Sequence, residues 1–467
     1  MVTSPKTPSP SFEIVPLETP SLGDRSYLVH DGTNAVVVDP QRDIDRVLDL
    51  STRLGVTVRH VLETHVHNDY VTGGHALARV TGAHYHVNAA DPVTFDRTPV
   101  GDGDTVEISP SLAVRALATP GHTYTHLSYV LLDDGRPVAV FTGGSMLYGS
   151  SGRPDLLGPD HTEPLARAQY ASLHRLAAQL PDDVPIFPTH GFGSFCSATQ
   201  TSGTSSTIGR EKDVNPALTK DEQAYLDELL AGLDAYPAYY AHMGPSNLTA
   251  PAGAPDLSAP SPADPAELRR RIEAGEWVVD LRNRTAFAAG HLTGTLNIGL
   301  DGPFSTYLGW LIPWGTPLTL LASTGEQIAE AQRELVRIGI DRPAAASTGG
   351  PATWSDGSDP GSLRRVTFAE LAAELATPRD DLVVLDVRRH SERRAGHVAG
   401  SVHLPLHDLL THLDDVPPGE VWVHCQSGYR ASLAASLLAA SGRAVVLVDD
   451  DFSGARDAGA EVVSPRS

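Results

Sequence analysis

The chain has 467 residues, enough for about three domains of ordinary size. Its 35 Lys and Arg against 57 Asp and Glu give a formal net charge of −22, which excludes nucleic acid and anionic membranes as favoured partners. Two cysteines exclude a disulfide framework, and no apolar run approaches the roughly 18 residues of a membrane span. With no signal-peptide pattern at its start, we expect a cytoplasmic protein that meets small molecules. The oligomeric state stays open, and a homo-oligomer is compatible with the sequence.

The predicted elements alternate between strands and helices. Residues 1–11, rich in Pro, Ser and Thr, predict a disordered tail. Short apolar runs then predict strands at 34–39, 56–62, 83–87, 106–108, 112–117, 127–132, 138–141 and 185–189. Apolar residues at helical spacing predict helices over 43–54, 74–80, 163–180 and 219–233. This order indicates an α/β fold in which helices cover sheets.

A histidine-rich turn follows the strand predicted at 56–62. His65, His67 and Asp69 are spaced by single residues and precede a Gly-Gly pair, so one point is within reach of all three side chains, as a divalent metal requires. His122, after Pro-Gly, and His190, before Gly, also follow predicted strands. Any one of these histidines alone is more often a surface or core residue. Together, their positions at strand ends predict a metal centre.

These motifs resemble the metallo-β-lactamase superfamily, and within it the persulfide dioxygenase branch that is fused to rhodanese domains. The matching segments are Thr64-His-Val-His-Asn-Asp-Tyr70, Pro120-Gly-His-Thr123, Phe141-Thr-Gly-Gly144, Gly152-Arg-Pro-Asp155 and Thr189-His-Gly191. The resemblance covers residues 12–243. It implies an αββα sandwich that binds a metal and oxidises a persulfide at a mononuclear iron.

Two positions depart from the family pattern. Tyr70 replaces the last histidine of the first motif, and Gly144 replaces the aspartate that bridges two metals or ligates a single iron. Both changes favour one metal over two, and the second removes the carboxylate of a two-histidine, one-carboxylate iron site. His65, His67 and His122 remain, a set of ligands that suits Zn²⁺ as well as Fe²⁺.

Several nearby residues are further candidates for this site. Asp69 or Asp155 is a candidate for the missing carboxylate, and His190 is a candidate for another metal ligand. Arg153 and Tyr70 are candidate substrate contacts, although a structural salt bridge explains Arg153 equally well. Cys196, near His190, is expected to be a buried small residue, with a sulfur relay as the alternative.

The second chemical motif is the six-residue loop Cys425-Gln-Ser-Gly-Tyr-Arg430, between an apolar strand at 421–424 and a helical run at 431–440. Loop N–H groups, the start of the helix and the Arg430 charge all favour the thiolate, so we assign catalytic roles to Cys425 and Arg430. A buried structural cysteine is the alternative. Residues 363–463 resemble the rhodanese family, and the length of the loop implies transfer of sulfur and not of phosphate.

Two segments share one pattern at identical spacing, which predicts two copies of a small α/β domain. The matching pairs are Asp280-Leu-Arg282 with Asp386-Val-Arg388, and Gly290-His-Leu292 with Gly396-His-Val398. We expect copies at 263–346 and 363–463, with linkers rich in Pro, Gly and Ser at 244–262 and 347–362. The resemblance gives Asp386, Arg388 and His397 structural roles.

The first copy lacks the chemical groups of the second. Ala322 and Gln327 stand where the second copy has Cys425 and Arg430. Without a nucleophile or a cation this copy cannot carry sulfur, so a scaffolding role is expected.

These observations predict an enzyme of sulfur and hydrogen sulfide metabolism. The first domain would oxidise a low-molecular-weight persulfide at iron, and Cys425 would transfer sulfane sulfur, with sulfite or thiosulfate as reaction partners. Two alternatives stay open: a zinc thioester hydrolase resembling glyoxalase II, and a non-catalytic first domain beside an active sulfurtransferase. The thiol carrier and the direction of transfer are not predicted.

Overall fold

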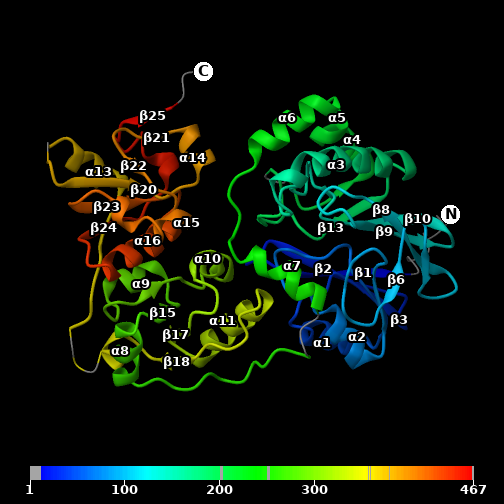
Figure 1. Cartoon of the computed structure of the whole chain (residues 1–467), viewed down its shortest axis with the longest axis horizontal. Helices are drawn as coiled ribbons and strands as arrows, with labels where there is room; N and C mark the ends of the chain where they lie inside the picture. Colours follow the sequence, from blue (N-terminus) through cyan, green and yellow to red (C-terminus); the bar gives the residue numbers. More distant parts are fainter. Residues whose placement is uncertain are drawn as a thin grey trace, which may run out of the picture. The chain divides into compact units, whose positions relative to one another are not determined.

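The computed structural model describes residues 12–199, 203–249, 253–355, 357, 359–377 and 379–464, so the predicted tail at 1–11 lies outside the described residues. The chain forms two compact units (Figure 1). The first contains residues up to Leu233, Tyr239–Pro255 and Val336–Gly339; the second contains Asp234–Ala238, Asp256–Leu335 and the residues from Ile340 on. In the part of the chain that the structure describes, no helix has the length and apolar character needed to cross a membrane.

Two six-stranded sheets form the centre of the first unit. The first sheet, β1 to β6 in order, is antiparallel up to β3 and parallel beyond it. Its strands are β1 (Glu13–Thr19), β2 (Asp24–His30), β3 (Asn34–Val38), β4 (Thr57–Leu62), β5 (His84–Asn88) and β6 (Thr98–Val100). The second sheet has the order β14-β13-β10-β9-β8-β7 and is antiparallel except between β10 and β13. Its strands are β7 (Thr105–Glu107), β8 (Leu112–Ala118), β9 (Leu127–Asp133), β10 (Arg136–Gly143), β13 (Pro185–Pro188) and β14 (Ser206–Thr207).

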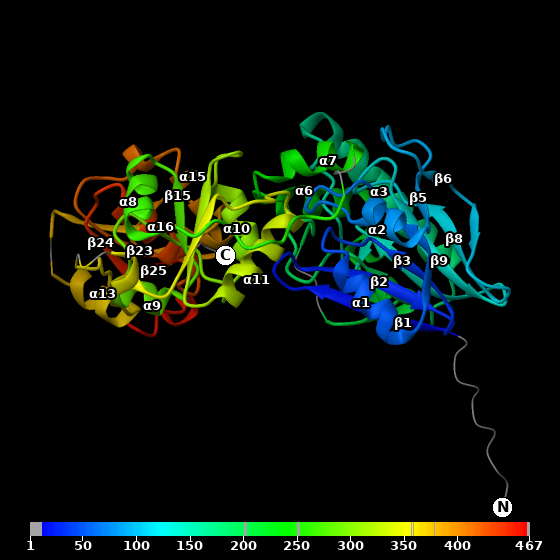
Figure 2. The same ribbon diagram turned by 90° about the horizontal axis from the view of Figure 1, so that it is seen from below.

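The main core of this unit lies between the two sheets. Val29 and Leu62 of the first sheet share one buried cluster with Tyr129 and Phe141 of the second. Helices α1 and α2 pack on the outer face of the first sheet, and α3 and α6 on that of the second. The helices are α1 (Asp45–Leu54), α2 (Gly74–Thr81), α3 (Pro159–Gln179), α4 (Ile208–Val214), α5 (Pro216–Thr219), α6 (Glu222–Gly232) and α7 (Tyr240–Thr249), beside the short pair β11 (Met146–Leu147) and β12 (Ser150–Ser151). This αββα sandwich, whose layers are seen edge-on in Figure 1, confirms the predicted fold class. Figure 2 shows the same unit from the side of α1 and α2.

The second unit contains two α/β lobes, each built on its own parallel sheet. The first-lobe strands, in the order β16-β15-β17-β18, are β15 (Trp277–Asp280), β16 (Leu296–Asn297), β17 (Leu318–Ala322) and β18 (Ala345–Thr348). The second-lobe strands, in the order β19-β24-β23-β20-β22, are β19 (Arg364–Val366), β20 (Leu382–Asp386), β22 (Val402–His403), β23 (Glu420–His424) and β24 (Val445–Val448). A separate antiparallel pair joins β21 (His397–Val398) to β25 (Val462–Val463).

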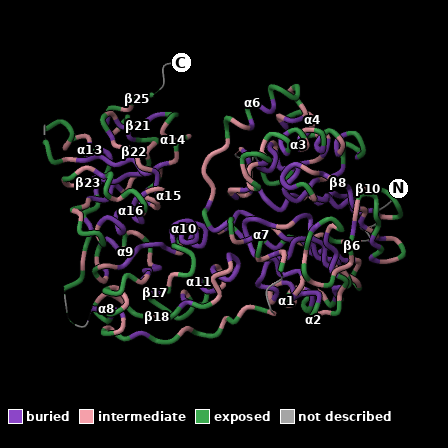
Figure 3. Tube along the Cα trace, viewed as in Figure 1, coloured by how far each residue is buried: buried purple, intermediate pink, exposed green. Residues whose placement is uncertain are grey.

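Helices surround both sheets, and the buried positions follow the central strands (Figure 3). In the first lobe they are α8 (Pro265–Glu273), α9 (Arg284–Ala289), α10 (Phe304–Leu311), α11 (Gly325–Arg337) and α12 (Pro351–Trp354). In the second lobe they are α13 (Phe368–Leu375), α14 (His390–Ala395), α15 (Leu406–Leu409) and α16 (Tyr429–Ala440), with 3-10 turns at Leu413–Asp415 and Phe452–Gly454.

The two lobes are joined by polar contacts. Ser432 donates to Asn297 Oδ1 at 2.7 Å, and the Tyr429 hydroxyl donates to the carbonyl of Gly299 at 2.8 Å. The Arg284 guanidinium pairs with Asp449 at 2.5 Å. These contacts hold α9 and the segment 297–299 of the first lobe against α16 and the end of β24 in the second.

The predicted domain limits fall in structured segments. Helix α7 runs past position 243, and α12, with the buried Trp354, lies inside the linker predicted at 347–362. The boundaries themselves stay predictions.

Candidate active sites

The predicted metal-site histidines of the first unit meet at the ends of strands. His65 and His67 follow β4, His122 follows β8 and His190 follows β13, and all four are buried. The ring centroids of His65 lie 4.1 Å from His67 and 4.9 Å from His122, and His122 lies 5.4 Å from His190. The parallel β10–β13 pair and the parallel run β3–β5 direct these loops to the same edge of the sandwich.

Three of these imidazoles have Nδ1 bound, which directs Nε2 into the cluster. His65 Nδ1 lies 2.9 Å from Thr64 Oγ1, and His122 Nδ1 donates to the carbonyl of Arg153 at 2.8 Å. His190 Nδ1 donates to Asp24 at 2.9 Å and lies 3.1 Å from Asp69. A carboxylate or carbonyl behind Nδ1 is the usual support of a metal-binding histidine.

The distances test whether these residues can hold a metal. His65 Nε2 and His190 Nε2 lie 3.4 Å apart, close to the roughly 3.3 Å expected between two nitrogens that each lie about 2.0 Å from a tetrahedral metal. The ligand atoms of His65, His67 and His190 lie within 4.8 Å of one another, and so do those of His122, His190 and Cys196. Among the described residues, His122 Nε2 has no hydrogen-bond partner although it is buried. The nitrogen-rich set therefore fits a divalent metal, with His190 common to both groups.

Position 144 supplies no carboxylate, and the space it would occupy is filled. A Cβ atom on Gly144 would lie 2.3 Å from His122 Cδ2. The Gly144 N–H instead donates to His126 Nε2 at 2.9 Å. The structure thus agrees with the predicted departure from a two-histidine, one-carboxylate iron site.

His67 has a second environment on its other side. Its Nε2 lies 3.3 Å from Asp39, 3.2 Å from Glu63 and 3.0 Å from the hydroxyl of Tyr70. Burial would lower the pKa of His67, but Asp39 and Glu63 raise it to about 9. Tyr70, a predicted substrate contact, is fully buried and stacks on His67 with ring centroids 4.3 Å apart, so it supports this ring.

Arg153 and Asp155 form a bidentate pair, with N–O distances of 2.7 and 2.8 Å. Arg153 is 3% exposed and also donates to the carbonyl of Phe195. The guanidinium therefore has protein partners, as in the salt-bridge alternative. Cys196 is buried 3.8 Å from the Tyr240 hydroxyl, and burial raises the pKa of its thiol well above the usual value.

Sequence reasoning missed four charged or polar residues of this site: Asp24, Asp39, Glu63 and His126. His126 stacks on His65 with centroids 5.0 Å apart, and its place four residues after His122 was a local signal. Asp39 follows the apolar run of β3 with a left-handed φ of 51°, a strained conformation for this residue. Its carboxylate accepts hydrogen bonds from Thr64 and Thr189, which tie two site loops together.

The Cys425 loop of the second unit connects β23 to α16. The Gly428 N–H lies 3.2 Å from Cys425 Sγ, at the start of the twelve-residue helix α16. Gly428 has φ 93°, and a Cβ there would lie 2.1 Å from Asp449 Oδ1, so this turn requires glycine. Cys425 is 2% exposed, and its thiol lies at the N-terminus of α16, where the helix dipole is positive.

Arg430 of this loop is held by Glu392, which sequence reasoning also missed. Arg430 makes two hydrogen bonds of 2.6 Å to the Glu392 carboxylate. Burial would raise the pKa of Glu392, but Arg430 lowers it to about 2. The pair fixes the guanidinium in one orientation.

Asp386 and Arg388 form a buried structural pair, as their predicted role requires. Arg388 donates to Asp386 at 2.9 and 2.8 Å and to the carbonyl of Gly396 at 2.7 Å. His397 takes part through its backbone, in the β21–β25 pair. In the first lobe, Arg282 makes the same contacts to Asp280 and Gly290.

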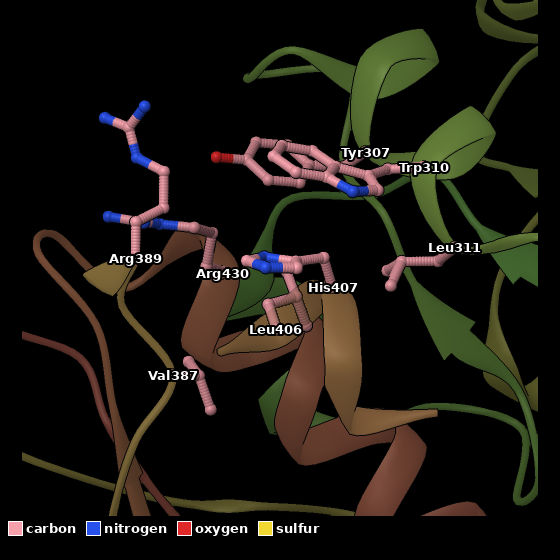
Figure 4. Close-up of a pocket in the computed structure, with 8 residues that line it drawn as sticks. All are labelled: Tyr307, Trp310, Leu311, Val387, Arg389, Leu406, His407 and Arg430. Atoms are coloured by element: carbon pink, nitrogen blue, oxygen red, sulfur yellow. The ribbon is translucent and has the colours of Figure 1, made fainter. Parts of the chain in front are cut away.

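A cavity beside the Cys425 loop is lined by both lobes (Figure 4). Tyr307, Trp310 and Leu311 come from α10 of the first lobe. The second lobe contributes Val387, Arg389, Leu406, His407 and Arg430. Trp310 lies between Tyr307 and His407, stacked at centroid distances of 6.1 and 5.1 Å. The first lobe therefore supplies the aromatic wall of this cavity as well as a scaffold.

Comparisons with known proteins find relatives of both parts of the chain. The rhodanese-like domain family matches residues 264–356 and 367–458. The human mitochondrial persulfide dioxygenase ETHE1 is 30% identical over 200 residues, which are 42% of this chain and 70% of that protein. The hydroxyacylglutathione hydrolase of Methylobacillus flagellatus is 31% identical over 182 residues, 39% of this chain and 67% of that protein. The solved structure of a metallo-β-lactamase from Staphylococcus aureus subsp. aureus COL has a TM-score of 0.64 and 26% identity, covering 73% of this chain and 100% of that chain. The predicted resemblances to the metallo-β-lactamase fold, to persulfide dioxygenases and to rhodaneses are confirmed.

Proposed function

We propose that this chain, which belongs to the metallo-β-lactamase-fold family of persulfide dioxygenases and hydroxyacylglutathione hydrolases and carries two rhodanese-like domains, transfers sulfane sulfur through Cys425. The observation that carries the proposal is the Cys425 thiol, held beside the Gly428 N–H at the start of α16, next to a cavity lined by Arg430. The chain is thus an enzyme of sulfur metabolism with a sulfurtransferase-type domain.

The transfer divides into two displacements at sulfur. The Cys425 thiolate attacks the outer sulfur of a persulfide R–S–S⁻, the old S–S bond breaks, and R–S⁻ leaves. Sulfite then attacks the outer sulfur of the cysteine persulfide, thiosulfate forms, and Cys425 returns to the thiolate. Each step exchanges one S–S bond for another, so neither an oxidant nor a reductant is consumed. The Gly428 N–H, the α16 dipole and Arg430 stabilise the negative sulfur in both states.

The aromatic wall gives a reason for a substrate with an organic part. Tyr307 and Trp310 provide apolar surface, while Arg430 places positive charge at the same cavity. An anionic low-molecular-weight thiol persulfide combines these two characters. The cavity has a volume of about 10 Å³, so binding of such a substrate requires side chains of its wall to move apart. Sulfite and thiosulfate have no organic part and would use only the positive charge of Arg430.

A direct test is the sulfurtransferase activity of the full chain and of two cysteine variants. Cys425→Ser should lower kcat/KM for sulfur transfer about a thousandfold or more, because serine is a poor sulfur nucleophile. Cys196→Ser, the matched control, should keep the activity. Equal activity of Cys425→Ser and the natural chain would contradict the proposal.

For the first unit we propose oxidation of a low-molecular-weight persulfide at a mononuclear iron, with zinc as the alternative metal. The identity to the human persulfide dioxygenase and the nitrogen-rich ligand set support a metal enzyme. Two groups of residues would hold the metal: His65, His67 and His190, or His122, His190 and Cys196, with His190 common to both. A bound redox-active metal supplies the activation of O2 that the reaction needs. The chain's own residues hold the histidine rings in place and, through burial, exclude water from the cluster.

The hydrolase relatives favour a second candidate for this unit, a zinc thioester hydrolase, since one of them is 31% identical to the chain. Oxygen uptake with glutathione persulfide on iron-loaded protein, measured together with metal content, separates the candidates. Uptake that depends on iron supports the oxidation. Stoichiometric zinc with thioester turnover and no oxygen uptake supports the hydrolase and contradicts the oxidation.

The two units would be coupled by chemistry, since sulfite made by persulfide oxidation is an acceptor for the sulfur on Cys425. We place this reaction in the cytoplasm, with small thiol persulfides, sulfite and thiosulfate as partners. Cys425→Ser should therefore abolish thiosulfate production and let sulfite accumulate. Unchanged thiosulfate production would contradict the coupling.

A further inference from the structure

A second cavity, of about 450 Å³, lies on the second rhodanese-like lobe and concentrates basic groups. The lining residues that matter here are His390, Arg393, Arg394, His397, His403 and Ser464. Among the described lining residues none is acidic, in a chain whose formal charge is −22. A local reversal of charge inside a concave surface attracts anions. This cavity shares no lining residue with the one beside Cys425.

The walls of this basic cavity are fixed by backbone pairing. Strand β21 pairs with β25, with His397 opposite Val463, and the Ala399 N–H donates to the carbonyl of Glu461 at 2.8 Å. Helix α14, which carries His390 and Arg394, precedes β21 directly. The cavity is therefore bounded by paired strands and a helix and not by a single loop.

Two of the basic side chains, Arg393 and His403, already donate hydrogen bonds to other residues of the protein. Arg393 donates to the Ser401 hydroxyl and carbonyl, both at 2.8 Å, and lies 3.4 Å from Asp386. His403 Nε2 donates to the carbonyl of Arg388 at 2.8 Å. Both side chains line the basic cavity and are held in place by these contacts.

The remaining donors of this cavity have no hydrogen-bond acceptor among the residues that the structure describes. Among the described residues, neither the exposed Arg394 guanidinium nor the His397 ring has a hydrogen-bond or ion-pair partner, and His390 contacts only the edge of the His403 ring, at 4.9 Å. Arg456 donates to the Ser464 hydroxyl at 3.3 Å, which adds a positive charge behind that hydroxyl. The basic cavity therefore has hydrogen-bond donors without a described protein partner, together with positive charge from Arg394 and Arg456.

We propose that this basic cavity binds a small molecule through a multiply charged oxyanion group of the phosphate or sulfur-oxyanion type. A guanidinium presents paired N–H groups that match such an oxyanion, and imidazole N–H and serine O–H groups complete its contacts. The volume lies within the range of about 300–1,000 Å³ that small-molecule sites have, so the ligand is larger than the oxyanion alone. The site is additional to the sulfur-transfer site and does not depend on its chemistry.

Calorimetric titration of the full chain tests the proposal, with pyrophosphate, inorganic phosphate and thiosulfate as probes at constant ionic strength. All titrated chains carry Cys425→Ser, so that thiosulfate cannot transfer its sulfur to Cys425 during the measurement. We expect saturable binding of at least one probe, which Arg394→Gln weakens about tenfold by removing a charged donor. Arg269→Gln, an exposed arginine of the first lobe away from the cavity, is the matched control and should leave binding unchanged. Tighter binding of pyrophosphate assigns a phosphate-type ligand, and tighter binding of thiosulfate assigns a sulfur oxyanion.

A second variant separates binding from folding. His397→Gln keeps the backbone pairing of β21 and should also weaken the probe, while the thermal midpoint without probe stays unchanged. The proposal is overturned if the natural chain binds no probe above a chloride control, or if Arg394→Gln and His397→Gln bind it as the natural chain does. Introduced separately into the chain that keeps Cys425, Arg394→Gln and His397→Gln should leave sulfurtransferase activity at the natural level, because neither residue lines the cavity beside Cys425.

Discussion

The two rhodanese-like lobes share one scaffold and differ in one loop. Arg282 binds Asp280 and the Gly290 carbonyl in the first lobe, and Arg388 makes the same set of contacts in the second. Ala322 ends β17 in the first lobe, and Cys425 follows β23, the corresponding strand of the second lobe. The repeated pair therefore belongs to the fold, and the chemistry belongs to the loop.

The second difference lies in the groups around the loop. Gln327 replaces Arg430, and its amide oxygen accepts from the N–H groups of Ser323 and Thr324, which closes the turn without charge. Ala286 stands where Glu392 holds Arg430 in the second lobe. Loss of the nucleophile was thus accompanied by loss of the cation and of its carboxylate. The first lobe nonetheless contributes to the active cavity, since α10 lines it.

Moving the reactive pair to the first lobe tests how far the loop alone decides activity. Ala322→Cys with Gln327→Arg, in a Cys425→Ser background, should leave sulfur transfer about a hundredfold or more below the natural chain. The grafted arginine would have no equivalent of Glu392 and no aromatic cavity. Steady-state sulfurtransferase kinetics check this. Recovery to within about tenfold of the natural rate would show that the surroundings contribute little.

Breaking the shared ion pair should cost more in the second lobe than in the first. The side chain of Arg388 is 2% exposed and that of Arg282 is 12% exposed. Arg388→Ala should lower the free energy of unfolding by about 3–5 kcal/mol, because a buried carboxylate loses its partner. Arg282→Ala should cost about 1–3 kcal/mol. Urea unfolding followed by circular dichroism measures both, and equal costs would contradict the difference in burial.

Acid should destabilise the second lobe through the carboxylates that its arginines hold. The pKa of Glu392 is lowered to about 2 against the raising effect of burial, chiefly by hydrogen bonds from Arg430. Since the folded pKa lies below the unfolded one, this stability is present above about pH 4.5 and is lost as pH falls toward about 2. We expect a loss of about 2 kcal/mol from this group, which Glu392→Gln removes. If the pH dependence of urea unfolding is the same in the variant, the pair does not contribute it.

The aromatic wall should affect binding more than chemistry. Trp310→Ala removes a stacked ring from the cavity beside Cys425 and should raise KM for an organic persulfide about tenfold, with little change in kcat. Trp314, which is 42% exposed and does not line the cavity, is the control for replacing a tryptophan in this segment. A fall in kcat at constant KM would assign Trp310 a different role.

Most of the fold, and the site residues that lie close together in the sequence, could be predicted from the sequence. In the first unit, the strands β3 to β5, β7 to β10 and β13 were predictable, as was the Cys425 loop of the second unit, because apolar runs and the loop spacing are local signals, whereas the short strands β6 and β14 were not predicted. The strands β1 and β2 were not predicted, because they contain charged and polar residues. Asp24 and Ser26 of β2 are buried and make hydrogen bonds that no local pattern reveals. Glu392 was missed for the same reason, since its partner lies 38 positions further along. The same limit applies to Asp24, whose partner His190 is 166 positions away.

Mapping the cysteine that carries the persulfide shows directly whether Cys425 transfers the sulfur. The full chain is incubated with thiosulfate or glutathione persulfide, alkylated, digested, and mapped by mass spectrometry. We expect a mass increase of one sulfur atom on the peptide that contains Cys425, with no such increase on the Cys196 peptide. Sulfur found only on Cys196, or on neither peptide while transfer proceeds, would contradict it.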